Sequence, residues 1–155
     1  MDRRRALRWG LASALGAGLG LGSGSARACE FFTRTLRVTH PWARATLLDE
    51  TSAVVCMKFD EVLQDDRLIG VQTMLATAAA IGHGRRTDAD ELPRSGVDLF
   101  IPKGQTTVLT EEGTHLRLLD LQWQLQVARA YPLDLIFEKG GRVQALLTID
   151  FLRAG

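Results

Sequence analysis

Few side chains in this sequence could bind a soft metal ion, so any metal site must be built from a small set of donors. The 155 residues include three histidines, three methionines and two cysteines. Cu(I) prefers imidazole, thioether and thiolate donors, and a four-cysteine zinc site is excluded by the cysteine count. His40 precedes Pro41 and is interpreted as a structural residue at a strand end. His83 and His115 are then the histidines that remain as candidate metal ligands.

The first 28 residues have the composition of an export signal rather than of a domain. Four arginines within residues 3–8 precede an uncharged, apolar and glycine-rich stretch over residues 9–22, and Ala26-Arg27-Ala28 follows as a small-x-small cleavage site. This pattern predicts a cleaved secretory signal over residues 1–28, with a twin-arginine signal as an alternative to the general route. A single domain over residues 29–155 is then expected in the periplasm.

Charge and motifs exclude several classes of function. The chain has a formal net charge of +1, and loss of the arginine-rich signal leaves a mildly acidic domain. Because nucleic-acid-binding domains usually carry a basic excess, we expect no nucleic-acid partner. No apolar run reaches the roughly 20 residues of a membrane span. Motifs of hydrolases, P-loop NTPases and dinucleotide-binding enzymes are missing, so we expect a protein that is not an enzyme.

Cys29 and Cys56 are the only cysteines, and export would place both in an oxidising compartment. Thiols in such a compartment tend to pair, so we expect a disulfide that ties the start of the domain to its second strand. A copper-thiolate site and two unpaired thiols are the alternatives. Met57 and Met74 are interpreted as core residues rather than ligands.

Alternation of apolar and polar residues indicates that strands position these groups. The clearest case covers residues 142–151, where Val143 and every second residue to Phe151 are apolar. A similar run over residues 133–137 precedes it, and Gly140-Gly141 between the two predicts a hairpin. Turn signals recur about every ten residues, which is typical of an all-β sandwich or barrel. Residues 119–131 are less clear and predict either a short helix or a loop.

Six segments of the domain carry a family resemblance, and they lie at residues 40–46, 52–57, 65–71, 101–104, 112–115 and 132–141. Their order and spacing resemble the periplasmic copper chaperone family of the PCu(A)C type. The resemblance implies a cupredoxin-like Greek-key β-sandwich or barrel that is exported to the periplasm. It also implies copper binding and delivery of copper to a cuproenzyme such as an oxidase.

The resemblance implies a metal site at which this sequence keeps the histidines and lacks the methionines. The family combines a histidine, a later methionine and a His-x-Met motif. His83 and His115 match the two histidines, whereas Arg117 stands at the motif methionine and Leu92 or Pro93 near the other. A guanidinium beside His115 would disfavour a bound cation unless it turns away.

Two hypotheses follow from this mixed pattern. In the first, His83 and His115 bind copper, as Cu(I) or Cu(II). In the second, the protein is a degenerate family member that no longer binds metal and acts as a protein-interaction module.

Overall fold

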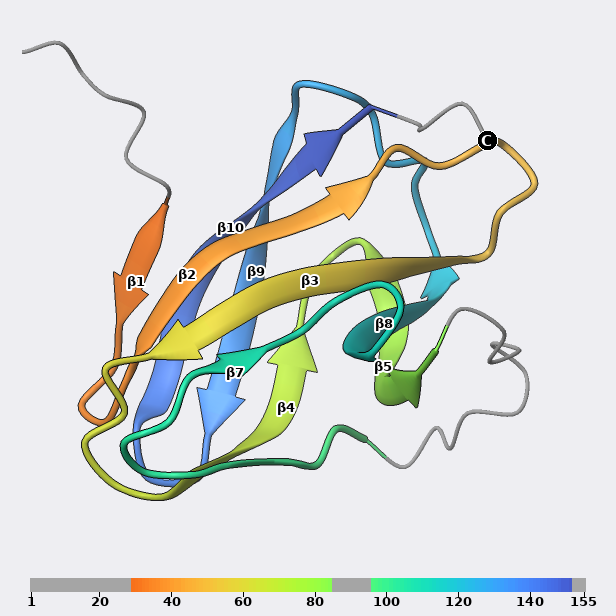
Figure 1. Ribbon diagram of the computed structural model, residues 1–155. Coiled ribbons are helices and arrows are strands. Elements are labelled where there is room, and N and C mark those ends of the chain that lie inside the picture. Colours follow the sequence, from red (N-terminus) through yellow and green to blue (C-terminus); the bar gives the residue numbers. More distant parts are fainter. Residues whose placement is uncertain (1–28, 85–95, 152–155) are drawn as a thin grey trace, which may run out of the picture.

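The computed structural model describes residues 29–84 and 96–151, and within these residues it contains strands and no helix (Figure 1). The strands are β1 Glu30–Phe32, β2 Arg37–Arg44, β3 Ser52–Asp60, β4 Asp66–Gln72, β5 Ala76–His83, β6 Leu99–Ile101, β7 Thr107–Val108, β8 Thr114–Leu121, β9 Ala130–Phe137 and β10 Gly141–Asp150. The prediction of an all-β fold is therefore confirmed. No helix in this part of the chain is suited to crossing a membrane.

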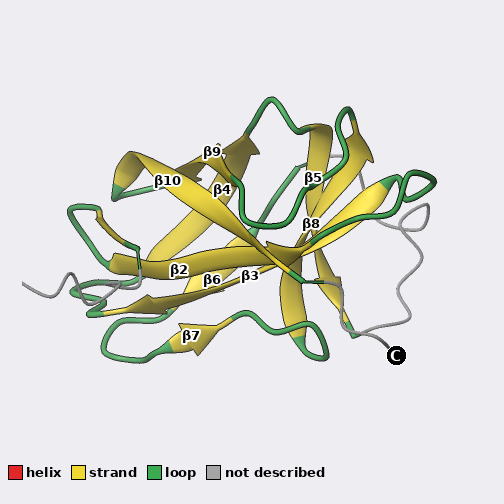
Figure 2. Ribbon diagram, turned by 90° about the horizontal axis from the view of Figure 1, so that it is seen from above, coloured by secondary structure: helices red, strands yellow, loops and turns green. Residues whose placement is uncertain are grey.

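The strands form one ten-stranded sheet that curls into a nearly closed barrel (Figure 2). Its order is β5-β8-β3-β2-β10-β9-β4-β6, with β1 paired to β2 and β7 paired to β3. All described pairs are antiparallel except β2 with β10, which run parallel. Neighbours such as β9 and β10 are joined by a tight turn, whereas β2 and β10 come from opposite ends of the domain.

Period-two alternation places one face of each strand in the core. In β10 the buried residues are Ala145, Leu147 and Ile149, as the pattern predicts. The predicted hairpin is present, since Gly141 pairs with Phe137 and has a positive φ of 80° that glycine adopts without strain. Residues 122–129 form a loop between β8 and β9, so the helical alternative for this segment is wrong.

The prediction that Met74 is a core residue is wrong, and Phe151 departs from the burial pattern of β10. Met57 is buried in β3 as expected, but Met74 is 66% exposed in the turn between β4 and β5. Phe151 continues the apolar pattern of β10 yet is exposed, because it lies just beyond the last paired residue. Side chains at these positions have no facing sheet to cover them.

A buried carboxylate ties several segments together at one end of the barrel. Asp66, at the start of β4, accepts hydrogen bonds from Thr35 Oγ1 at 2.6 Å, Lys139 N at 2.8 Å, Gly140 N at 2.9 Å and Arg67 N at 2.8 Å. Burial raises the pKa of this carboxyl group, but the hydrogen bonds outweigh burial and the net pKa is lowered. The ionised carboxylate therefore links β4 to the β1–β2 turn and the β9–β10 turn.

We predict that Asp66→Asn lowers the free energy of unfolding by about 3 kcal/mol, as measured by urea denaturation. Hydrogen bonds to a charged acceptor are worth about 1.5–3 kcal/mol each, and the new amide nitrogen would face N–H donors. Because folding lowers the pKa of Asp66, its contribution is complete above the unfolded value of about 3.9 and is lost as the pH falls further. Stability should thus fall less steeply on acidification in the variant than in the wild type.

The matched control for this prediction is Asp98→Asn. Asp98 makes an exposed ion pair with Arg67 at 2.6 Å, and exposed pairs contribute little. A loss of stability in this control as large as that of Asp66→Asn would contradict a special role for the buried carboxylate.

Candidate metal site

His115 lies near the start of β8 with its side chain fully buried, at 0% exposure. Its Nδ1 is 3.2 Å from the carbonyl oxygen of Gly113. A carbonyl can only accept, so Nδ1 carries the proton and Nε2 keeps its lone pair. No hydrogen-bond partner for Nε2 exists among the described residues. A buried imidazole nitrogen with an unused lone pair is a candidate metal donor.

The imidazole fits against the sheet because a glycine stands opposite it. Gly82 on β5 is the register partner of His115. A Cβ atom built on Gly82 would lie 2.6 Å from His115 Nε2, a distance that real Cβ atoms essentially never show. The need for Gly82 could not be predicted from the sequence, because the pairing with His115 joins two distant segments.

Burial keeps the His115 imidazole neutral. Burial lowers the pKa of His115, the Gly113 carbonyl opposes this, and the nearby Arg117 and His83 lower it further. The resulting pKa lies below the ordinary histidine value, so the ring is uncharged at neutral pH. A neutral ring whose Nδ1–H is bound to a backbone carbonyl is the form in which histidine ligates metals.

His83 is the last residue of β5, is exposed, and has Nδ1 3.0 Å from Thr114 Oγ1. In the β5–β8 register, Gly82 faces His115 and His83 faces Thr114. Because side chains alternate along a strand, the two histidines lie on opposite faces of this strand pair. The structure thus places them one register position apart without bringing their rings onto one face. The described residues contain no group of three or more His, Cys, Asp or Glu arranged for a metal ion.

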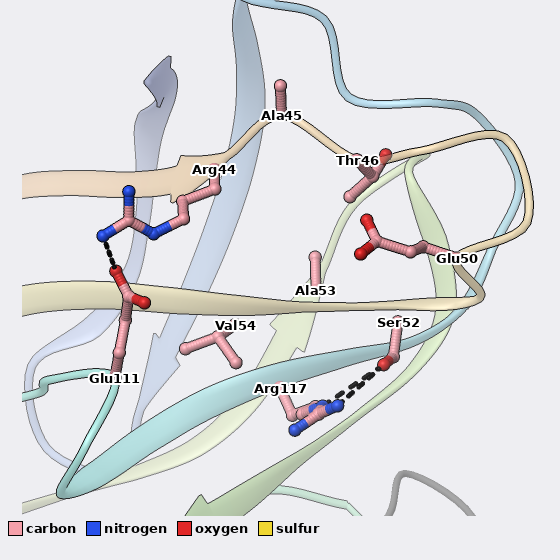
Figure 3. Close-up of a pocket in the computed structure, with 9 residues that line it drawn as sticks. All are labelled: Arg44, Ala45, Thr46, Glu50, Ser52, Ala53, Val54, Glu111 and Arg117. Atoms are coloured by element: carbon pink, nitrogen blue, oxygen red, sulfur yellow. Dashed lines mark hydrogen bonds and ion pairs between the residues drawn. The ribbon is translucent and has the colours of Figure 1, made fainter. Parts of the chain in front are cut away.

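Arg117 shares a face with His115 but reaches in the other direction along β8. Its Nε and Nη2 donate to Ser52 Oγ at 3.2 and 3.1 Å (Figure 3). Ser52 is opposite Leu119 in the register, two residues beyond Arg117 and farther from His115. The guanidinium is therefore turned away from the His115 ring. Ser52 could not be identified from the sequence, because it comes from a strand 65 positions earlier in the chain.

A small cavity of about 200 Å³ lies beside this arginine and is lined in part by residues of β3 (Figure 3). Its charged groups are engaged within the chain, since Arg44 forms an ion pair with Glu111 at 2.6 Å and stacks over Trp42 at 5.5 Å. We therefore assign no ligand to this cavity. It is lined by Arg44, Ala45, Thr46, Glu50, Ser52, Ala53, Val54, Glu111 and Arg117.

Cys29 and Cys56 are both free thiols, so the expected disulfide is not formed in the structure. Cys29 precedes β1 and Cys56 lies in β3, with β2 between these strands. Two strand spacings amount to about 9.6 Å, beyond the Cα separation that a disulfide bridges.

Burial, with a smaller effect of Glu111, raises the pKa of Cys56 to about 12 against the opposing effect of Arg44. The thiol stays protonated, which makes it a poor copper ligand.

The barrel has the fold of known copper-binding PCuAC domains. The copper-bound PCuAC domain from PmoF2 matches with a TM-score of 0.68 and 24% identity, covering 79% of this chain and 98% of that one. The apo PCuAC domain from PmoF1 gives 0.67 and 27%, with 79% and 99% covered. CuI-DR1885 from Deinococcus radiodurans gives 0.58 and 21%, with 76% and 80% covered. The predicted PCu(A)C-type, cupredoxin-like fold is confirmed.

A family model identifies the family of this chain more specifically than the fold does. Residues 36–149 match the family described as putative lipoprotein LpqE-like, and the chain belongs to the LpqE-like family. A search of curated proteins found no match.

We predict that Gly82→Ala destabilises the protein by about 1–3 kcal/mol, because the new methyl group would overlap His115 Nε2. The free energy of unfolding from urea titration is the measurement. The same substitution in a His115→Ala background should cost much less, since the overlapping ring is gone. An equal cost in both backgrounds would show that Gly82 is needed for a reason other than the histidine.

Proposed function

We propose that this protein binds copper, as Cu(I) or Cu(II), through His115 with His83 as the second ligand. The observation that carries the proposal is the neutral, buried His115 ring, whose Nε2 has no hydrogen-bond partner among the described residues. Two of the solved structures with this fold are a copper-bound PCuAC domain and CuI-DR1885. We further propose that the protein is exported through a cleaved N-terminal signal, acts in the periplasm and delivers copper to a cuproenzyme such as an oxidase, without being an enzyme itself. The family description as a putative lipoprotein supports export.

Copper reaches His115 only if the end of β5 separates from β8, because Nε2 faces Gly82. The pairs of Gly82 with His115 and of His83 with Thr114 are the last two of this ladder. Opening the end of a strand pair costs little compared with opening its middle. The same opening changes the position of His83, which is the residue next to Gly82.

A site with two imidazole donors suits a protein that must release its cargo. Cu(I) accepts two nitrogen ligands, and the thioethers that would strengthen the site are replaced by Arg117 and by residues near position 92. The Arg117 guanidinium donates to Ser52, and its positive charge, which lowers the pKa of His115, also weakens the binding of a cation there. Weak binding then favours transfer to an acceptor with more ligands.

The opposite faces of His83 and His115 favour a second candidate function. If the register of β5 and β8 never opens, only one histidine would reach a given ion, and the domain would serve as a protein-interaction module without metal. The following experiment separates the two functions.

The purified protein should take up one Cu(I) in an anaerobic competition with a chromophoric chelator at micromolar concentrations. His115→Ala should weaken Cu(I) binding at least tenfold, because it removes the buried donor. His83→Ala should weaken it to a smaller extent. His40→Asn is the control and should leave affinity unchanged, since His40 lies on β2 and asparagine tolerates its positive φ of 49°. Absence of uptake by the wild type would favour the interaction module.

Replacing Arg117 by methionine should strengthen Cu(I) binding at least tenfold in the same competition. Arg117 lies two residues from His115 on β8, so a thioether there would face the same side of the sheet as the imidazole. Arg117→Leu is the matched control, because it removes the charge without adding a sulfur donor. Equal affinities of the methionine and leucine variants would show that no metal sits beside His115.

A further inference from the structure

A groove of about 350 Å³ lies between the loop that joins β8 to β9 and the turn that joins β4 to β5. Its apolar lining consists of Met74, Leu75 and Trp123. Arg129, just before β9, and Tyr131, near the start of β9, line the groove as well. Small-molecule sites have volumes of about 300–1,000 Å³. The groove therefore has room for a small ligand with an apolar body.

Hydrogen bonds fix the backbone of Arg129 and of the residue before it. Arg129 N donates to the carbonyl of Gln126 at 3.3 Å, and the Arg129 carbonyl accepts from Ile149 N of β10 at 3.2 Å. Ala128 N donates to the carbonyl of Ile149 at 3.2 Å, and Ala128 has a positive φ of 64°, which is uncommon for a residue other than glycine. The end of β10 thus holds Arg129 at the border of the groove.

The apolar side of the groove is tied to the barrel as well. Gln122 N donates to the carbonyl of Leu75 at 2.8 Å, which joins the two segments that border the groove. Gln124 Nε2 donates to the carbonyl of Thr46 at 2.8 Å. Trp123 lies in the chain between these two anchored glutamines. Because both sides are held, the groove is formed before a ligand arrives, and little ordering of the loop opposes binding.

The polar groups of the groove suit an anion. Arg129 carries the only charge among the described residues that line it, and within the described part of the chain its guanidinium makes no ion pair. Tyr131 Oη accepts a hydrogen bond from Gln126 N at 3.4 Å, which leaves the hydroxyl proton for another acceptor. A guanidinium and a hydroxyl are suitable donors to a carboxylate. One guanidinium balances a single negative charge, so a monocarboxylate fits better than a phosphate group, which carries about −1.5 to −2.

We propose that this groove binds an apolar monocarboxylate of the size of a medium-chain fatty acid. Arg129 and Tyr131 bind the carboxylate, and the hydrocarbon chain covers Met74 and Trp123, which are both exposed in the free protein. Burial of this apolar surface favours binding. The groove is separate from the histidines, because β5 begins beside it and ends at His83. The proposal therefore does not depend on copper binding.

The test is a titration of the purified protein with octanoate, without added metal, followed by two-dimensional NMR. The indole N–H resonance of Trp123 reports on the groove, and its loss in Trp123→Phe assigns it. Octanamide is the control ligand, because it has the same chain and no charge. We expect the resonance to shift with octanoate until it saturates, and octanamide to bind roughly tenfold more weakly or less, since it forms no ion pair with the guanidinium.

Arg129→Gln should weaken octanoate binding roughly tenfold or more, because it removes the cation and keeps a polar side chain. The matched control is Arg34→Gln, which removes an exposed arginine from the turn between β1 and β2 and should stay within about twofold of the wild type. Circular dichroism of each variant checks that the barrel is intact. The proposal would be overturned if the Trp123 resonance did not saturate at millimolar octanoate, if octanamide bound as well as octanoate, or if both arginine variants lost affinity equally.

Discussion

The Asp66 carboxylate closes the end of the barrel at which four segments meet. The barrel depends on the parallel pairing of β2 with β10, and parallel neighbours cannot be joined by a short turn. Asp66 supplies a connection at one end, because it binds both Thr35 in the β1–β2 turn and Gly140 in the β9–β10 turn. Gly140 has no room for a side chain, since a Cβ would lie 2.6 Å from Thr35 Oγ1. One buried charge thus connects the turns that precede β2 and β10, whereas the ends of these two strands pair with each other directly.

The fold of this chain agrees with that of PCuAC domains, whereas its candidate site departs from the pattern that the resemblance implies. The barrel keeps the PCuAC architecture at 21–27% identity, which requires only that buried positions stay apolar. At the site, Arg117 stands where the resemblance predicts a methionine, and its contact with Ser52 gives the guanidinium a partner on β3. His115 remains, with Gly82 opposite and Gly113 fixing its tautomer. The buried imidazole is therefore the part of the candidate site that the pairing of β5 with β8 holds in place.

Local sequence patterns predicted the strands well. The predictions that were wrong depend on pairing between segments that are far apart in the chain. The alternation over residues 142–151 and the Gly140-Gly141 turn determine β9 and β10 because both signals are contained in a short stretch. The exposure of Met74 and the separation of Cys29 from Cys56 depend on which strands become neighbours. The family resemblance predicted that His83 and His115 belong to one site, and the structure has them on the neighbouring strands β5 and β8. It could not give their faces, because a shift of one residue in register exchanges the two sides of a strand.

In the copper site that we propose, the register of β5 against β8 would couple metal binding to packing. The contact that buries His115 against Gly82 also keeps His83 on the other face, since the two residues are adjacent in β5. An ion that engages both rings must first break this contact, and the energy of the broken packing is subtracted from the affinity. When the ion leaves, the ring returns to Gly82 and the packing energy is recovered. The close fit of a glycine to an imidazole would in this way lower affinity and favour release, which is the behaviour required of a protein that passes copper on.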